Sequence, residues 1–144
     1  YRGKDMAITT ALCTSFKKEL FEAVHDFTSD TFKIALYSSS ASLDATTTAY
    51  STSNEVSGTG YSAGGVTLSV VAPSTDGTTG LVDFGNPSWS NSTFSTSGAL
   101  IYNSSKSNTA VSVFSFGSSQ SVSSANFNIT MPAAAAGSAI VRIN

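Results

Sequence analysis

Charged side chains are scarce in this sequence. They make up 11% of its 144 residues, where about 25% is usual for a globular domain. Serine, threonine, glycine and asparagine take their place. Disordered chains commonly combine high net charge with few aromatic residues, whereas this chain has a net charge of −2 with nine Phe, five Tyr and one Trp. We therefore expect one folded domain with an uncharged surface rich in serine and threonine.

Other scarcities exclude whole classes of partner. Seven Lys and Arg stand against nine Asp and Glu, so the chain lacks the basic excess that neutralises phosphates, and no nucleic acid is expected. No apolar run approaches the roughly 20 residues that span a bilayer, so no membrane is expected. The single cysteine, Cys13, excludes an internal disulfide and any multi-cysteine zinc site. It is expected to be a small buried hydrophobe, which suits folding in a reducing cytoplasm.

The sequence also has few residues of the types that usually act in catalysis. The one histidine, His25, would lie about 18 Å from Cys13 along a continuous helix, too far for a nucleophile–base pair. We expect His25 to complement the dipole or cap the end of that helix. The sequence has no calcium loop, no pair of histidines at metal-ligand spacing and no phosphate-binding loop in its usual context. The prediction is therefore no catalytic residue, no metal, no cofactor and no enzymatic activity.

One segment has helical periodicity. Leu12, Phe16, Leu20 and Val24 recur at four-residue spacing, which predicts an amphipathic helix of three to five turns within Leu12–Phe27.

Beyond this helix the apolar period changes from 3.6 to 2, which indicates strands. Turn residues separate short apolar segments at the spacing typical of a β-sandwich or barrel. A long polar loop, Ser38–Gly60, interrupts the series. The predicted strands are Phe32–Tyr37, Val66–Ala72, Gly80–Phe84, Ser88–Phe94, Gly98–Tyr102, Ala110–Phe116, Phe127–Met131 and Ala139–Ile143.

Two of these strands form a predicted hairpin, Gly98–Phe116, with its turn at Asn103–Lys106. Both faces of the hairpin are apolar, so it is expected in the centre of the sheet. A further turn is expected at Gly117–Ser119. The expected fold is mainly β: a single β-sandwich, jelly-roll-like, of about eight strands, with one N-terminal α-helix. Residues 1–10 are expected to form an N-terminal arm, and residues 11–144 the helix plus sandwich domain.

The aromatic residues Trp89 and Phe94 flank a short polar run. Aromatic rings beside polar groups occur on sugar-binding β-sandwiches, but they serve more often as anchors of a core or an interface. Both interpretations stay open from the sequence. Sugar binding requires Trp89 or other aromatic residues to lie exposed on a groove.

Several blocks of the sequence resemble small structural proteins of tailed bacteriophages. The resemblance extends over nearly the whole chain from Met6 to Ile143. The blocks that carry it are Ile8–Leu20, Val24–Phe27, Thr31–Tyr37, Asn54–Tyr61 and Gly98–Asn103.

This resemblance implies a non-enzymatic virion protein, made in the host cytoplasm and present in many symmetric copies. A capsid decoration or cement protein on the outer head surface is the favoured role, and a tail or fibre component is the alternative. A carbohydrate-binding β-sandwich module for host attachment is the alternative of another class. The implied partners are other virion proteins, namely the major capsid protein or tail proteins.

A symmetric homo-oligomer, most plausibly a trimer, is the expected attached unit. Candidate assembly contacts lie in the N-terminal segment and the polar loop, because loops and chain ends often carry interactions. Met6 and Ile8 have no local core to enter and are expected to be buried against another chain. Tyr50 and Tyr61 lie in and just after the polar loop.

Overall fold

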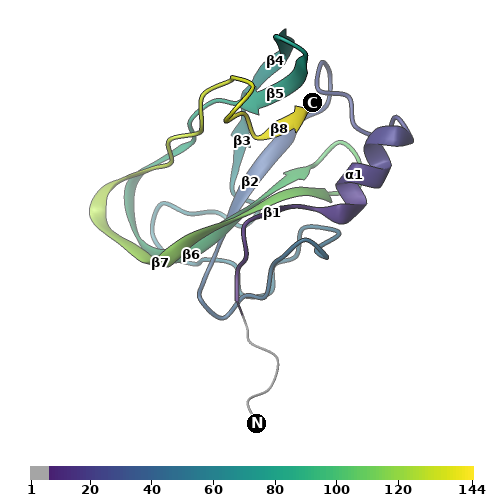
Figure 1. The fold of residues 1–144 in the computed structure, drawn as a ribbon. Coiled ribbons are helices and arrows are strands. Elements are labelled where there is room, and N and C mark those ends of the chain that lie inside the picture. Colours follow the sequence, from purple (N-terminus) through teal and green to yellow (C-terminus); the bar gives the residue numbers. More distant parts are fainter. Residues whose placement is uncertain (1–6) are drawn as a thin grey trace.

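The computed structural model describes residues 7–144, which form two antiparallel sheets and one short helix (Figure 1). The larger sheet has the order β1-β7-β6-β2-β3, and the smaller sheet has the order β4-β5-β8. The mainly β fold with a single N-terminal helix is therefore confirmed. The elements are β1 (Ala11–Leu12), α1 (Thr14–Phe21), β2 (Phe32–Tyr37), β3 (Val66–Leu68), β4 (Val70–Asp76), β5 (Thr79–Phe84), β6 (Ser88–Asn103), β7 (Thr109–Asn128) and β8 (Val141–Ile143).

The helix α1 is shorter than predicted: its eight residues make about two turns, not three to five. Leu12 belongs instead to β1. At the other end Ala23 has a φ of 59°. The Ala23 N–H donates to Leu20 O (3.2 Å), and the Val24 N–H donates to Glu19 O (3.0 Å). These two bonds form a Schellman motif, which ends the helix and redirects the chain.

The helix is held by one anchor, Phe16, which is fully buried. Its ring contacts His25 and Phe27 of the following loop. Phe27 in turn stacks on Phe32 at the start of β2, with 4.7 Å between ring centroids. Of the four periodic residues, Phe16 is buried, whereas Leu12, Leu20 and Val24 are half-buried. Phe27 packs against this core from a loop and not from a helix.

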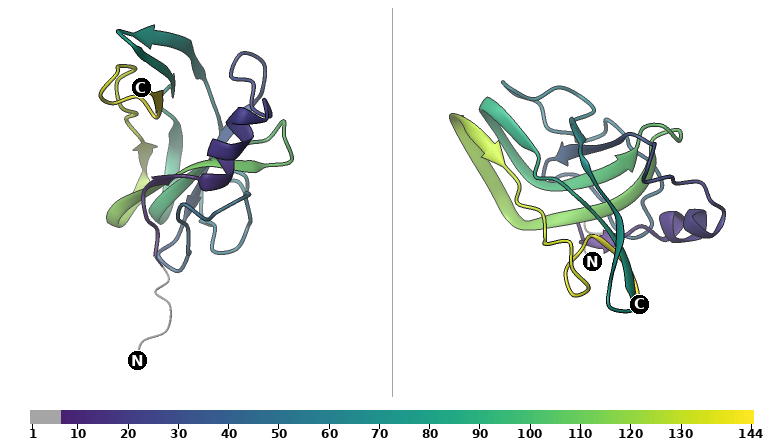
Figure 2. Two further views of the ribbon diagram at one scale, coloured as in Figure 1. Left: turned by 45° about the vertical axis from the view of Figure 1, so that its right-hand side comes forward. Right: turned by 90° about the horizontal axis from the view of Figure 1, so that it is seen from above.

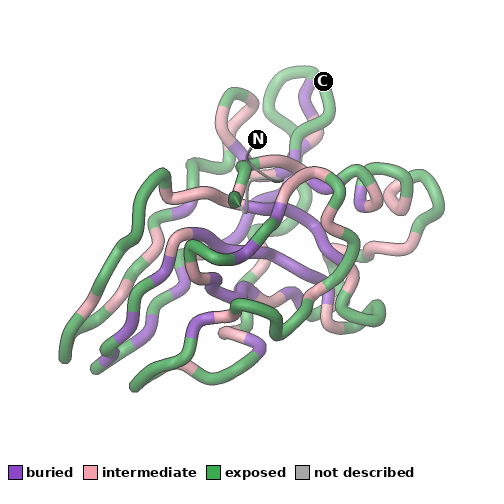
Figure 3. The backbone as a smooth tube through the Cα atoms, turned by 90° about the horizontal axis from the view of Figure 1, so that it is seen from below, coloured by how far each residue is buried: buried purple, intermediate pink, exposed green. Residues whose placement is uncertain are grey.

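The core is densest where β2, β6 and β7 run together. In register, Leu100 of β6 lies between Ala35 of β2 and Val113 of β7, and all three side chains are fully buried. The predicted hairpin is confirmed here, with its turn after Asn103 and with both of its strands internal to the sheet. Figure 3 shows this concentration of buried residues in the middle of the molecule.

The strands β6 and β7 are longer than predicted. The segments Ser88–Phe94 and Gly98–Tyr102 are one continuous strand, β6. The turn expected at residues 117–119 lies inside β7. There Gly117 has a φ of 79°, and the register shifts opposite it between Thr96 and Gly98. A positive-φ glycine and a bulge bend both strands without breaking them, as Figure 2 shows.

The outer parts of these two strands, residues 88–97 of β6 and 116–128 of β7, are called the hairpin arm below. Phe127 and Asn128 are the last residues of β7 and belong to the arm. The prediction of a separate strand at Phe127–Met131 is therefore wrong.

The smaller sheet also departs from the prediction at one point. The expected strand Val66–Ala72 is two strands, since β3 pairs with β2 and β4 pairs with β5. The chain therefore crosses between the two sheets at Ser69. The predicted last strand is confirmed in a shorter form as β8, which pairs with β5.

Candidate assembly surfaces

His25 lies inside a closed polar network. Its Nε2 is 2.8 Å from Glu19 Oε1, and its Nδ1 accepts from Asn103 Nδ2 at 3.0 Å. Asn103 also donates to Asp30 Oδ2 (2.8 Å) and accepts at Oδ1 from the Ser105 N–H. The His25 side chain is fully buried. The expectation that His25 caps the helix is therefore wrong. Its ring nitrogens contact the side chains of Glu19 and Asn103, so His25 connects the helix to the β6–β7 turn.

Cys13 is fully buried at the N-cap of α1, with no exposed surface. Burial raises the pKa of its thiol to about 11, and the nearby carboxylates of Asp44 and Glu19 add to the effect. A thiol with a raised pKa is a poor nucleophile at neutral pH. The expected role of Cys13 as a buried hydrophobe agrees with this environment.

A second polar network is centred on Glu55 of the long loop. Its carboxylate accepts from the hydroxyls of Tyr50 (2.7 Å) and Tyr61 (2.5 Å) and from the Gly64 N–H (2.8 Å). The Tyr61 hydroxyl also accepts from the Leu36 N–H of β2. These bonds fasten the loop to the edge of the larger sheet.

Two more tyrosines complete this attachment. Tyr37 donates to Ser51 O (2.6 Å), and Tyr102 donates to Gly64 O (2.7 Å). Tyr50 stacks on Tyr102 with 4.7 Å between ring centroids. Desolvation by burial raises the pKa of all four tyrosines, that of Tyr102 to about 12.

The candidate contacts Tyr50 and Tyr61 are thus half-buried and hold their own domain together. Their hydroxyls are engaged with Glu55, so only the outer parts of their rings remain for another chain. A contact of either residue with a partner stays a prediction.

Ile8 packs on its own sheet. The Thr9 N–H donates to Leu43 O (2.8 Å), and the Leu43 N–H donates to Ala7 O (3.0 Å). The side chain of Ile8 lies over Gly98, where an added Cβ would come within 2.7 Å of the Ile8 Cδ1. Gly98 therefore makes room for Ile8. Burial of Ile8 against another chain stays a prediction, and Met6 lies outside the described residues.

The inner face of the hairpin arm is an aromatic cluster. Trp89 is 3% exposed and contacts Tyr61 and Phe127. Phe94 contacts the same two rings at 5.9 and 5.4 Å between centroids. These rings are the core of the arm. Trp89 therefore offers no exposed platform for stacking on a sugar.

The outer edge of the arm is open. The strand β1 pairs with β7 only at Val113 and Ser112, and Thr10 Oγ1 accepts from the Ser115 N–H. Within residues 7–144, no strand pairs with the outer edge of residues 116–128. Most of these residues are exposed, and neither strand of the arm contains a charged residue or a proline.

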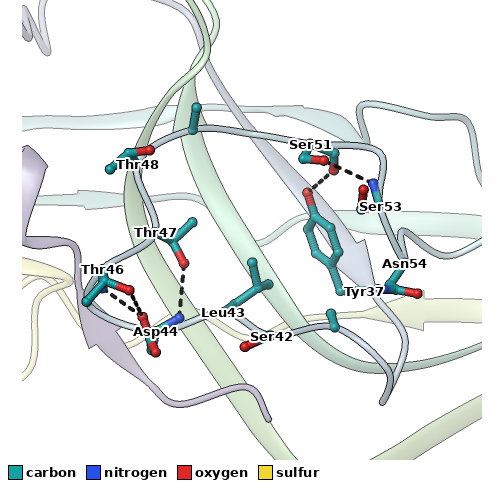
Figure 4. A pocket seen from close by; sticks show the side chains of 12 residues that line it. Tyr37, Ser42, Leu43, Asp44, Thr46, Thr47, Thr48, Ser51, Ser53 and Asn54 are labelled. Atoms are coloured by element: carbon teal, nitrogen blue, oxygen red, sulfur yellow. Dashed lines mark hydrogen bonds between the residues drawn. The ribbon is translucent and has the colours of Figure 1, made fainter. Parts of the chain in front are cut away.

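A polar hollow of about 440 Å³ lies under the long loop (Figure 4). Its wall consists mostly of serine, threonine and alanine from residues 41–54, and Tyr37 closes one side. The Asp44 Oδ1 accepts from the Thr46 N–H and hydroxyl, and the Tyr37 hydroxyl is engaged with Ser51. The polar groups of the hollow therefore largely serve the loop's own turns.

Among residues 7–144, no three histidine, cysteine, aspartate or glutamate side chains converge as metal ligands. The same residues include no helix with the length and hydrophobicity of a membrane span.

Comparisons with known proteins return no similar protein: no family model matches the chain, and no curated protein or solved structure matches it significantly.

Proposed function

We propose that this chain is a non-enzymatic structural protein of a bacteriophage virion. In this role it attaches in many symmetric copies to the outer head surface as a decoration or cement protein, and its partner is the major capsid protein. The resemblance of its sequence blocks to phage structural proteins supports the virion setting. The proposal includes a homo-oligomer, expected to be a trimer, and sandwich packing of the two sheets with jelly-roll-like connectivity.

The observation that carries this proposal is the open, uncharged edge of the hairpin arm. Unpaired strand edges invite pairing with other chains, and proteins that stay monomeric protect them with lysine, proline or a covering segment. Residues 118–123 of β7 are without charge or proline, and within the described part of the chain they pair on one side only. Such an edge suits assembly by addition of a strand from a neighbouring chain.

Two further observations favour assembly over the alternatives. Both ring nitrogens of His25 are engaged within the domain, and Cys13 is buried with a raised pKa, so neither is placed for catalysis. Trp89 is buried, so this ring is not available as the exposed aromatic platform of a carbohydrate-binding module. A tail or fibre position remains the alternative within the virion.

The experiment is addition of purified protein to phage particles that lack it. A variant with Ser119→Lys and Ser123→Lys places two charges on the open edge. Both positions are exposed, so stability should change by less than about 0.5 kcal/mol. We expect wild-type protein to bind the head in electron micrographs and the variant to lose at least about tenfold in occupancy, because an edge lysine opposes strand addition.

The matched control carries Ser74→Lys and Thr78→Lys, at exposed positions outside the arm and outside the long polar loop, and should bind as the wild type does. Equal occupancy of all three proteins would contradict assembly through the arm. Binding of the wild type at the tail would replace the head position with the tail or fibre alternative. Sedimentation of the free protein measures whether the unit is a trimer.

A further inference from the structure

A second surface, far from the arm in the chain, lies between α1 and β8. It is an apolar groove of about 390 Å³. One wall consists of Leu12 of β1 with Lys17, Leu20 and Phe21 of α1, and the other wall is β8 (Val141–Ile143). The groove therefore lies between the edge strands of the two sheets.

Large apolar side chains stand uncovered at this groove. Phe21 is 94% exposed and Ile143 is 65% exposed. Val71, at 40%, is the remaining large apolar side chain exposed in residues 7–144, and it lies on β4 outside the groove. Apolar surface in contact with water is unfavourable by about 25 cal/mol per Å², so two such residues at one groove indicate an interaction site.

The groove follows the edge of β8 and not one of its faces. Successive side chains of a strand point to opposite sides, yet all three residues of β8 line the groove. The strand pairs with β5 on one side, and within the described chain no strand pairs with its other side. Backbone groups along this free edge can therefore bond to an added extended segment.

The charges at the groove are positive. Lys17 and Arg142 both line it. The nearby helix carboxylates are engaged elsewhere, Glu22 with Lys18 at 2.6 Å and Glu19 with His25. Arg142 donates from Nη1 to Ala136 O (3.3 Å), and no carboxylate of residues 7–144 forms an ion pair with either cation. A complementary occupant therefore carries acidic groups.

We propose that this groove binds an extended segment of a partner protein that combines apolar with acidic side chains. The segment adds as a strand to the free edge of β8. Its apolar side chains cover Phe21 and Ile143, and its carboxylates meet Lys17 and Arg142. In the proposed virion role the segment belongs to a neighbouring virion protein, but the binding test below is independent of that role.

Two short synthetic peptides test the proposal, one alternating valine with glutamate and the other alternating valine with lysine. Binding to the full chain is followed by the amide chemical shifts of the isotopically labelled protein. We expect the glutamate peptide to bind at least about tenfold more tightly than the lysine peptide, because of the two cations. The shifts should concentrate on β8 and the end of α1.

Variants with matched controls assign the contacts. Phe21→Ser should lower the affinity for the glutamate peptide about tenfold, because an aromatic side chain that the partner covers dominates binding. Val71→Ser should leave the affinity unchanged. Lys17→Gln should weaken binding of the glutamate peptide and should not weaken binding of the lysine peptide, because it removes an attraction for the first and a repulsion for the second. The neighbouring Lys18→Gln, outside the groove, should change neither.

Equal affinity for the two peptides, or binding that survives Phe21→Ser, would overturn the proposal. Failure of both peptides to shift the amides of Val141, Arg142 and Ile143 at millimolar concentration would do the same. A second copy of this chain is the other conceivable occupant. A concentration-dependent dimer that Phe21→Ser dissociates would assign the groove to that copy and reject a different partner. None of these results depends on whether the chain adds to phage heads.

Discussion

Residues 98–103 of β6 are buried throughout, whereas residues 88–97 of the same strand alternate between buried and exposed. The inner part lies between β2 and β7 with aliphatic side chains on both faces. The outer part packs one face on the aromatic cluster and presents serine, threonine and asparagine on the other. One strand thus serves two purposes: its inner part stabilises the domain, and its outer part forms a surface.

The comparison explains the unusual composition of the chain. Charged groups are excluded from the inner part by burial, where an unpaired charge would be very unfavourable. In the arm they are absent although the surface is exposed, so burial does not account for their absence. The proposed pairing of this surface with other chains would account for it, because charges would oppose pairing.

The largest expected effect is on the inner part of β6, residues 98–103. Leu100→Ala should lower the free energy of unfolding by about 3–5 kcal/mol, because the side chain is fully buried and the core cannot collapse around the cavity. Urea denaturation followed by circular dichroism measures this change. The exposed Thr78→Ala is the control, with an expected change below about 0.5 kcal/mol. A loss below about 1 kcal/mol for Leu100→Ala would contradict the packing described.

A second pair of variants tests whether the arm has a core of its own. Trp89→Ala should lower the free energy of unfolding by about 3 kcal/mol and should speed hydrogen exchange more in the arm than in β2. Trp89→Phe should lower the free energy of unfolding by less than about 1.5 kcal/mol. An aromatic ring remains at this position, and no hydrogen bond is lost because the Trp89 Nε1 has no hydrogen-bond partner in residues 7–144. Equal losses for both variants would reject an aromatic core in the arm.

The dependence of stability on alkaline pH tests the tyrosine network that attaches the long loop to the larger sheet. The pKa values of Tyr37, Tyr50, Tyr61 and Tyr102 are raised in the folded state. Above the ordinary tyrosine pKa of about 10, the unfolded chain therefore loses protons that the folded chain retains. This difference favours unfolding, so the contribution of the tyrosines to stability should be constant below that pH and should fall progressively above it.

Denaturation midpoints measured at several pH values report this fall, and the absorbance of tyrosinate shows when the residues ionise. Tyr61→Phe should make the fall shallower because it removes one titrating group. The buried Cys13 also has a raised pKa, so Cys13→Ala should reduce the fall and is measured in parallel. Ionisation of all tyrosines near pH 10 in the folded protein would show that the network is not formed.

The smallest effect is expected at the end of α1, outside both regions. Ala23 has a positive φ, which is unfavourable for any residue with a Cβ. Ala23→Gly should therefore stabilise the domain by up to about 1 kcal/mol. Ala125 in the arm does not have a positive φ, so Ala125→Gly relieves no backbone strain and should destabilise the domain slightly. Thermal unfolding of the two variants side by side measures the difference, and a loss of stability with Ala23→Gly would contradict the Schellman motif.

The sequence located the inner part of the hairpin well because the signal there is strong. Leu100, Tyr102, Val111 and Val113 alternate around an ordinary turn, and both their type and their burial were predictable. The arm was predicted poorly, since its serine-rich segments have the composition of turns. The composition predicts a turn at Gly117, but with a partner strand beside it a positive-φ glycine bends β7 without ending it.

The helix shows a different limit of the sequence. The four-residue spacing of Leu12, Phe16, Leu20 and Val24 extends beyond both ends of α1, because Leu12 belongs to β1 and Val24 follows the turn at Ala23. The polar networks of His25 and Glu55 join residues far apart in the chain, for example His25 and Asn103. Local patterns do not contain such pairings. The groove beside β8 depends on the meeting of two sheet edges, which is likewise set by tertiary structure.

The continuity of β6 and β7 through the bend also has a mechanical consequence. A force that pulls the arm away from the body acts along both strands, so it loads in shear the hydrogen bonds that β6 makes with β2. Bonds loaded in shear must break together, whereas bonds that are peeled apart break one by one. The arm is thus continuous with the buried part of β6, and tension applied at its far end is carried by the whole β2–β6 ladder.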